Sequence, residues 1–187
     1  QGSIWIDLGN EDWSAVKVTS NGWRVFADAP IHFRRTAGME SLPIPVAGGS
    51  LDDLRPFLNV GTEDQFKFLV GWLLGALRPT GPFPILVING EQGSGKSTLA
   101  RVMRMLVDPN TLPIRSKPRG EQDLYIAANN GWVISLDNLS SVNDWLSDCL
   151  CRLATGGGFS TRKLYSDDDE ILINVTCPIV INGIPDL

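Results

Sequence analysis

Apolar and polar residues alternate in short runs through the first part of the chain. The runs at 15–19 and 23–27 flank Asn21-Gly22, a pair typical of a tight hairpin turn in which both turn residues have positive φ. A further short strand is predicted at 31–35, where apolar and polar residues again alternate. These runs predict a small β-meander, because each strand has one apolar face and none has the length of a helix.

The spacing of apolar residues changes to a helical one after a stretch at 38–50 that is rich in Pro and Gly. Thr62 and Gln65 have the spacing of a capping box, which marks the start of a helix. Apolar residues then recur at intervals of three and four, the period of one helix face, at Phe66, Leu69, Val70, Leu73, Leu74 and Leu77. Arg78-Pro79 ends the predicted helix.

Apolar runs alternate with helical patterns in the rest of the chain. Strands are predicted at 84–89, 132–136 and 177–182, and helices lie between them, with a hairpin at 159–175 around an acidic turn. Alternating strands and helices predict an α/β fold with a parallel sheet flanked by helices. The sequence therefore predicts a β-rich appendage over 4–49 and an α/β core over 50–187. The Pro- and Gly-rich stretch is either an ordered loop lying across the core or a linker.

A glycine-rich motif begins where the first of these apolar strands ends. It matches the pattern G-x-x-x-x-G-K-[ST] between a strand and a helix, which is typical of the P-loop of proteins that bind a nucleoside triphosphate. Backbone amides of such a loop and the amino end of the next helix hold phosphate oxygens. The motif predicts a site for ATP or ADP with Mg2+, built from Gly90, Glu91, Gln92, Gly93, Ser94, Gly95, Lys96, Ser97 and Thr98.

Particular side chains of this motif and of the next strand carry the predicted chemistry. Lys96 is expected to reach the β- and γ-phosphates, and the Ser97 hydroxyl is expected to bind Mg2+. Asp137 follows the strand at 132–136 and is the candidate second metal ligand, although an acid that merely ends a strand is the alternative. Asn138 comes next, where a Glu commonly orients the attacking water. Because an amide is not a base, slow hydrolysis is expected.

Three later segments extend the motif into a family resemblance. After the P-loop come Leu136-Asp137-Asn138, the glycine-rich run at 155–165 and the apolar run at 177–183 that contains Asn182. In this order they resemble the ATPase core of superfamily 3 helicases, a branch of the AAA+ P-loop ATPases. More specifically, they resemble the helicase-type module of virus- and phage-type primase-helicases and related bacterial mobile-element ATPases. The resemblance covers about 85–187 and leaves out the β-rich first third.

The resemblance implies roles for residues outside the P-loop. It implies that Asn182 is a polar sensor of the γ-phosphate or water, and that Arg162 and Lys163 contact nucleic acid or a neighbouring subunit. A turn-capping Asn and two solvated surface charges are the alternatives. The turn at 166–170 is acidic, whereas the family's hairpin tip tends to be basic. The resemblance further implies a homo-oligomeric ring, and a core that normally continues past the sensor strand with an arginine for the neighbouring subunit's ATP.

Charge and composition argue against several classes of binding partner. The net charge of −5 and the pI of about 4.8 argue against a surface that coats duplex DNA. Single-stranded DNA is therefore expected to bind only weakly to the chain alone. No apolar run is long enough for a membrane helix, and the three cysteines lack the paired spacing of a zinc site. These features predict a cytoplasmic protein with free thiols. His32, the single histidine, lies in a predicted strand far along the chain from the glycine-rich motif, and a structural role is expected for it.

Three functions remain open from the sequence. The first is the ATP-binding core of a DNA-acting motor in replication or mobile-element maintenance. The second is a nucleotide-dependent switch or assembly ATPase with slow turnover, which Asn138 and the acidic hairpin favour. The third is a P-loop kinase of a small molecule, although 89 residues precede the motif and no acceptor lid is evident.

Overall fold

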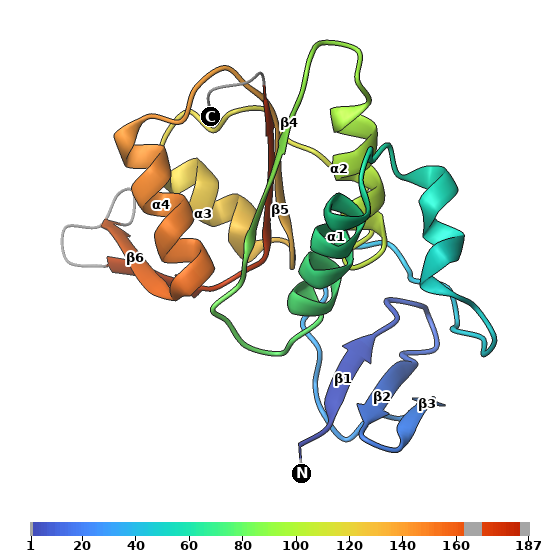
Figure 1. The fold of residues 1–187 in the computed structure, drawn as a ribbon. Coiled ribbons are helices and arrows are strands. Elements are labelled where there is room, and N and C mark those ends of the chain that lie inside the picture. The colour runs from blue at the N-terminus through green and yellow to red at the C-terminus, as the bar shows by residue number, and fades with distance from the viewer. Residues whose placement is uncertain (1, 163–169, 184–187) are drawn as a thin grey trace.

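The computed structural model describes residues 2–162 and 170–183. Its amino-terminal part is an antiparallel sheet with the strand order β1-β2-β3 (Figure 1). The strands are β1 (Ile4–Asp7), β2 (Ala15–Thr19) and β3 (Gly22–Phe26). This part of the chain is therefore a meander, as its alternating runs predict.

Two details of the predicted meander are wrong. Thr19 pairs with Gly22, so the hairpin loop consists of Ser20 and Asn21, and only Gly22 has a positive φ, at 116°. Residues 31–35 do not form a strand. Two neighbouring arginines of this segment instead bond to different parts of the molecule. Arg35 donates to Asp7 of β1, whereas Arg34 donates to Asn129 of the core. The segment therefore lies between the antiparallel sheet and the core.

A parallel sheet forms the centre of the core, with the strand order β4-β8-β5. Its strands are β4 (Ile85–Asn89), β8 (Ile179–Gly183) and β5 (Ile134–Leu139). Both β5 and β8 begin two residues later than predicted. The mixed α/β class is confirmed, with one antiparallel and one parallel three-stranded sheet. β4 is an outer strand, and Val87 on it is 46% exposed, so this strand is less covered than its apolar sequence predicts.

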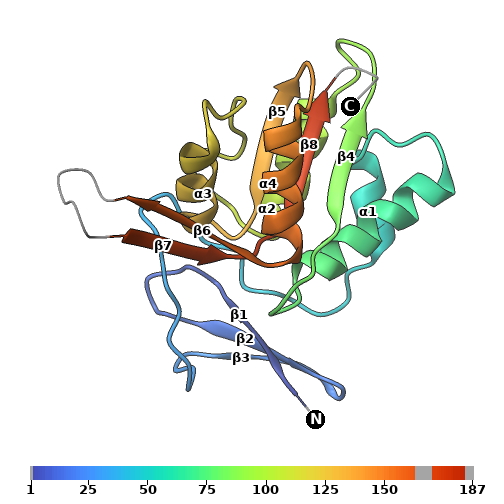
Figure 2. The same cartoon turned by 90° about the vertical axis from the view of Figure 1, so that its left-hand side faces the viewer.

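Helices cover both faces of the parallel sheet (Figures 1 and 2). The helices α1 and α2 lie on one face, and α3 and α4 lie on the other. A 3-10 helix precedes α1. The bounds are Leu51–Phe57 for the 3-10 helix, Glu63–Ala76 for α1, Lys96–Met105 for α2, Glu121–Asn129 for α3 and Asp144–Thr155 for α4. The predicted capping box starts α1, with Thr62 accepting from the Gln65 amide.

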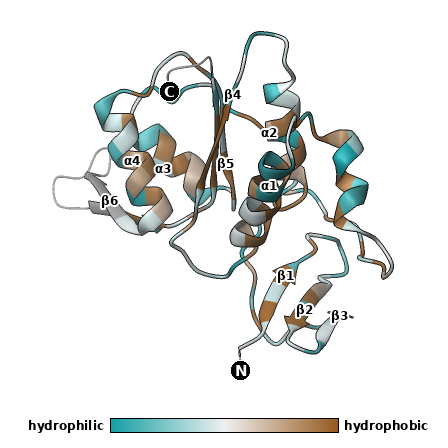
Figure 3. Ribbon diagram, in the orientation of Figure 1, coloured by the Kyte–Doolittle hydropathy of each residue, from teal (hydrophilic) through white to brown (hydrophobic). Residues whose placement is uncertain are grey.

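Successive residues of β8 supply the two halves of the core. Val180 packs with α1 and α2, whereas Ile179 and Ile181 pack with α3 and α4. This period of two puts apolar residues on both faces of the sheet, which Figure 3 shows as brown strands between the helix pairs. The predicted stripe of α1 needs one correction, because Leu74 is 61% exposed and Trp72 is buried in its place.

A second antiparallel pair joins the core beside α3 and α4. It consists of β6 (Gly157–Arg162) and β7 (Glu170–Val175), in which Gly157 pairs with Val175 and Arg162 pairs with Glu170. The predicted hairpin is confirmed for these strands. Its tip at 163–169, which contains Lys163 and most of the acidic turn, lies outside the described residues.

The segment after β3 crosses the surface of the core. The Thr111 amide donates to the Gly38 carbonyl, and the Glu40 amide donates to the Pro109 carbonyl. The Pro- and Gly-rich stretch therefore begins as an ordered connection against the core. Over residues 2–162 and 170–183, no helix has the length and apolar character needed to cross a membrane.

Candidate functional site

The glycine-rich loop connects β4 to α2 at the carboxyl end of the parallel sheet (Figure 1). Gly93 and Gly95 have φ values of 81° and 82°, in the left-handed region that side chains other than glycine rarely adopt. A Cβ atom on Gly90 would lie 2.8 Å from the Ser94 hydroxyl oxygen. The backbone conformation of the loop therefore favours glycine at Gly93 and Gly95, and a side chain at Gly90 would need the Ser94 hydroxyl to move.

The amino end of α2 carries no side-chain cap. Gly95 occupies the capping position, and within residues 2–162 and 170–183 no side-chain cap hydrogen bond is formed there. The first amides of a helix have no partner within the helix, and the helix dipole adds partial positive charge at this end. The loop and the helix end together provide a group of backbone donors suited to an anion.

Lys96 lies over the loop that precedes it. Its ammonium group donates to the carbonyl oxygens of Gly90 and Glu91, each at 2.7 Å. Asn59, which follows the 3-10 helix, donates through its side-chain amide to the Ser94 carbonyl at 2.8 Å. Sequence reasoning missed Asn59, because it lies in an irregular connection and matches no motif. The loop is thus tied to the segment before α1.

Three polar side chains from different elements meet beside the loop. The Ser97 hydroxyl donates to Oδ1 of Asp137 at 2.6 Å, and the Asn182 amide donates to the same oxygen at 2.7 Å. Asn182 is 1% exposed, at the carboxyl end of β8. Because β8 lies between β4 and β5, the three residues predicted as hydroxyl, carboxylate and sensor come together through one carboxylate oxygen.

Asn138 has a backbone role that its sequence position does not reveal. Its φ of 55° is in the left-handed region, where asparagine is favoured over most residues. The pairing of β5 with β8 is irregular between Leu136 and Leu139, and the Asn138 amide donates to Oδ1 of Asn182 at 2.9 Å. The side chain of Asn138 is exposed. The backbone conformation alone therefore accounts for asparagine at this position.

The remaining predicted residues either belong to the glycine loop and the start of α2 or lie elsewhere in the molecule. Glu91, Gln92 and Thr98 are exposed members of the motif. Arg162 is at the far end of β6, on the left of Figure 2 and away from the glycine loop, and Lys163 is outside the described residues. The structure thus brings together the residues predicted for a nucleotide and separates Arg162 from them.

The cysteines and the histidine do not join this cluster. The three cysteines are free thiols, of which Cys149 and Cys177 are buried and Cys151 is exposed. Burial raises the pKa of Cys149, and it raises the pKa of Cys177 to about 12. His32 is exposed and lines a cavity near the antiparallel sheet. The candidate site therefore depends on the loop, Lys96 and the Ser97–Asp137–Asn182 cluster.

The chain matches a protein-family profile. Residues 51–186 match the profile of a family described as actinomycete integrative conjugative element replication protein. The match includes the glycine loop, Asp137 and Asn182 and excludes the antiparallel sheet. No curated protein matches the chain.

Solved structures share the fold. The A-form apo structure of the NrS-1 C-terminal region is 14% identical over 97% of this chain, with a TM-score of 0.53. An apo structure of residues 305–718 of NrS-1 is 13% identical over 96% of this chain, with a TM-score of 0.52. The chain spans 42% and 53% of those two chains. At this identity the similarity concerns the arrangement of elements, and it includes the antiparallel sheet.

Proposed function

The chain belongs to the family of actinomycete integrative conjugative element replication proteins, and on that premise we propose that it is an ATP-binding core of a replication ATPase. In this proposal the parallel sheet and its helices are a P-loop NTPase fold of the AAA+ type, and the glycine loop binds the phosphates of ATP or ADP. The proposal concerns the part of the chain that the family profile matches.

The observation that carries the proposal is the shared Oδ1 of Asp137. A P-loop site needs a hydroxyl at the start of the helix and a carboxylate at the end of a neighbouring strand on the same side of the sheet. Ser97 and Asp137 meet this requirement at 2.6 Å, directly beside the glycine loop. Hydroxyl and carboxylate oxygens also suit Mg2+, which binds few protein ligands and keeps its remaining positions for water and phosphate.

The residues of the cluster then have separate tasks. Lys96 exchanges the carbonyls of Gly90 and Glu91 for phosphate oxygens, so its charge is already at the loop before a nucleotide arrives. Ser97 and Asp137 would hold Mg2+, which when bound neutralises charge between the β- and γ-phosphates. Asn182 fixes Asp137 through one side-chain atom and the Asn138 amide through another. It therefore couples the metal-side carboxylate to the strand end where water would be oriented.

A second candidate is a nucleotide-dependent switch or assembly ATPase with slow turnover. It is favoured by Asn138, which occupies the place of a carboxylate base and has an amide that accepts no proton. An arginine from a neighbouring subunit commonly contributes about 10³–10⁵ in rate in P-loop enzymes, so the chain alone is expected to hydrolyse ATP slowly. The ATPase rate with and without single-stranded DNA separates the motor from the switch, because only a motor couples the two.

Nucleotide-dependent stability tests the proposal. ATP or ADP with Mg2+ should raise the melting temperature, since a ligand at 100 times its dissociation constant adds about 2.7 kcal/mol. Lys96→Ala should remove most of this shift. Lys67→Ala is the matched control, because Lys67 is an exposed lysine on α1 that pairs with Asp64 and lies outside the loop.

Two outcomes of this experiment would contradict ATP binding at the glycine loop. An unchanged melting temperature at millimolar nucleotide, in a protein that unfolds cooperatively, excludes a functional phosphate loop. An equal loss of the shift in Lys67→Ala and Lys96→Ala would show nonspecific charge binding. Titration with and without Mg2+ then separates the phosphate loop from the Ser97–Asp137 pair, because only the latter depends on the metal.

A further inference from the structure

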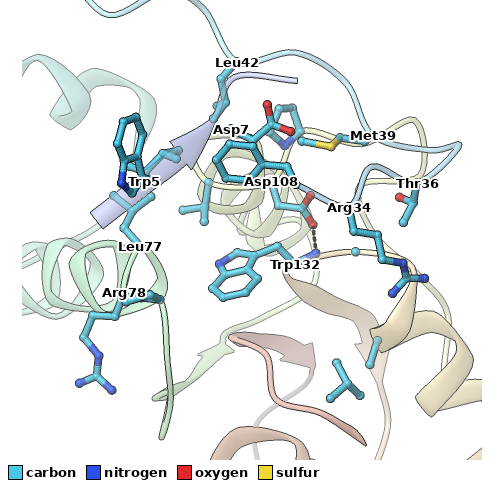
Figure 4. A pocket seen from close by; sticks show the side chains of 18 of the residues that line it. Trp5, Asp7, Arg34, Thr36, Met39, Leu42, Leu77, Arg78, Asp108 and Trp132 are labelled. Atoms are coloured by element: carbon cyan, nitrogen blue, oxygen red, sulfur yellow. Dashed lines mark hydrogen bonds between the residues drawn. The ribbon is translucent and has the colours of Figure 1, made fainter. Parts of the chain in front are cut away.

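A cavity of about 470 Å³ lies at the end of the parallel sheet opposite the glycine loop, since its lining includes Trp132, which precedes β5. Figure 4 shows the side chains that line it. Its walls come from β1, the segment at 32–42, the end of α1 and the residues that precede β5 and β8. The volume is in the range of small-ligand pockets, which usually combine apolar walls with a few polar groups. None of the residues proposed to bind ATP lines it.

The two carboxylates in the wall are already neutralised by arginines. Asp7 accepts two hydrogen bonds from the Arg35 guanidinium, at 2.8 and 2.6 Å. Asp108 is bonded to Arg104 at 3.1 Å and also accepts from the Trp132 and Val133 amides. These acids therefore contribute little negative charge to the cavity.

Two arginines on opposite sides of the cavity have no such partner. Arg34 lies to the right of Trp132 in Figure 4, and Arg78 lies to the lower left. Among the described residues neither forms a salt bridge; Arg34 donates to the neutral Asn129 side chain, and Arg78 donates to the carbonyls of Thr80 and Pro82. Both are exposed. The rim of the cavity is therefore positive, although the chain as a whole is negative.

Aromatic rings occupy the space between these cations. Trp132, which is 37% exposed, lies between the two arginines, and Trp5 lies on the β1 side. Trp5 is paired across the antiparallel sheet with Lys17, and Lys17 is paired with Arg24, so the three side chains share one face. The Lys17 ammonium is 5.3 Å from the centre of the Trp5 ring. Cations and aromatic rings thus continue from the cavity across the sheet.

We propose that this cavity and the adjoining sheet face bind single-stranded nucleic acid, with a base between Trp5 and Trp132 and its flanking phosphates at Arg34 and Arg78. Proteins that bind single strands combine a cationic path for the backbone with aromatic rings on which bases stack. An aromatic peptide would also suit the apolar walls, but it would leave the two uncompensated arginines without a counterpart. This nucleic-acid site is separate from the proposed ATP site, and the argument for it does not depend on ATP binding.

Fluorescence anisotropy of a labelled oligothymidylate, without nucleotide and at low salt, tests the proposal. The double variant Arg34→Glu with Arg78→Glu should weaken binding by tenfold or more. It should also reduce the slope of log K against log[salt] by about 1.4, because each phosphate contact on a single strand contributes about 0.7. Arg101→Glu with Arg119→Glu is the matched control, since both arginines are exposed and neither lines the cavity.

The tryptophans test the stacking part. Trp5→Leu and Trp132→Leu should each weaken binding by about fivefold or more, as expected for one stacked base. Because the Trp132 indole donates to the Ala76 carbonyl, Trp5→Leu keeps this part testable if the other variant folds poorly. Lys96→Ala should bind the oligonucleotide as the unaltered chain does, so failure of the ATP site and failure of this site are distinguishable.

Four results would overturn the proposal. These are no binding of single strands at low salt, equal affinity for a blunt duplex, equal losses in the matched control, and loss confined to Arg162→Ala. The last result would show that single strands bind at the β6–β7 hairpin and not at the cavity. Displacement of the oligonucleotide by free thymidine monophosphate at high concentration, lost in Trp5→Leu, would support the base pocket directly.

Discussion

The two ends of the parallel sheet differ in how their polar groups are assembled. At the carboxyl end, the glycine loop and Lys96 come from one continuous motif, to which β5 and β8 add Asp137 and Asn182 and the segment before α1 adds Asn59. At the amino end, the cavity is lined by segments from β1 to the residues before β8, which are far apart in the sequence. The first arrangement can be recognised as a motif, whereas the second exists only in the folded chain.

The two ends are also stabilised differently. At the amino end, Arg104 and Asp108 form a buried ion pair, with side chains that are 1% and 6% exposed. Arg104 also donates to the carbonyls of Leu112 and Pro113, and Asp108 accepts two backbone amides. At the carboxyl end, by contrast, the hydrogen bonds of Lys96 and of the Ser97–Asp137–Asn182 cluster are only partly buried or are exposed. The amino end is therefore expected to be rigid, and the carboxyl end is expected to adapt to a ligand.

The largest expected effect follows from the buried ion pair. Asp108→Ala should lower the free energy of unfolding by about 3–5 kcal/mol, because it leaves the Arg104 guanidinium buried and without its counter-charge. Urea unfolding followed by tryptophan fluorescence measures this change. Lys67→Ala, which breaks the exposed pair with Asp64, should cost less than about 1 kcal/mol. Similar losses in both variants would show that the buried Arg104–Asp108 pair adds no more than an exposed pair, and would contradict the rigidity inferred for the amino end.

A smaller effect is expected at the carboxyl end. Asn182→Ala should cost about 1–3 kcal/mol, because the buried Asn182 side chain serves both the Asp137 carboxylate and the Asn138 amide. The same variant should weaken the stabilisation by ATP and Mg2+ if the cluster forms the metal side of the site. Urea unfolding with and without nucleotide measures both quantities. A loss as large as that of Asp108→Ala would show that the carboxyl end is equally rigid.

The left-handed conformation of Asn138 gives a third and smaller effect. Asn138→Ala should cost about 1–2 kcal/mol, because a Cβ residue without a short polar side chain is disfavoured at positive φ. Asn138→Gly should be nearly neutral, since glycine adopts this conformation without steric cost and keeps the amide that donates to Asn182. Thermal unfolding of the two variants measures the difference. Equal losses would mean that the asparagine side chain, and not the backbone, is required.

The carboxyl end could be predicted because its geometry follows from local rules. A glycine loop between a strand and a helix places Ser97 at the start of the helix, and parallel strands place Asp137 at the same edge of the sheet. Asn182 required the family resemblance in addition, because an asparagine after an apolar run is also typical of a turn. The roles of these residues toward ATP and Mg2+ stay predictions.

The parts that could not be predicted depend on contacts between distant segments. The segment at 31–35 has the alternation of a strand, but Arg34 and Arg35 bond to the core and to β1 and no neighbouring strand pairs with them. Leu74 fits the predicted apolar stripe of α1 and yet is exposed, whereas Trp72 is buried. Which of the two side chains faces the core depends on packing against other elements of the folded chain. Nothing in the order of residues indicates that Trp5 and Trp132 line one cavity.

The smallest expected effect is a difference in thiol reactivity that leaves stability unchanged. Cys177 precedes β8 at the amino end, and burial raises its pKa to about 12. Near pH 8 only about one molecule in ten thousand would carry this thiolate, which is the reactive form. Cys149 is also buried with a raised pKa, whereas Cys151 is exposed. A disulfide reagent should therefore react rapidly with one thiol per chain, and Cys151→Ser should remove that rapid phase.

The slow reaction of Cys177 should be unaffected by nucleotide. It should be faster in Asp108→Ala, because the rate of this reaction depends on opening of the amino end. Rapid reaction of Cys177 in the unaltered protein would show that this end opens readily and would contradict its rigidity.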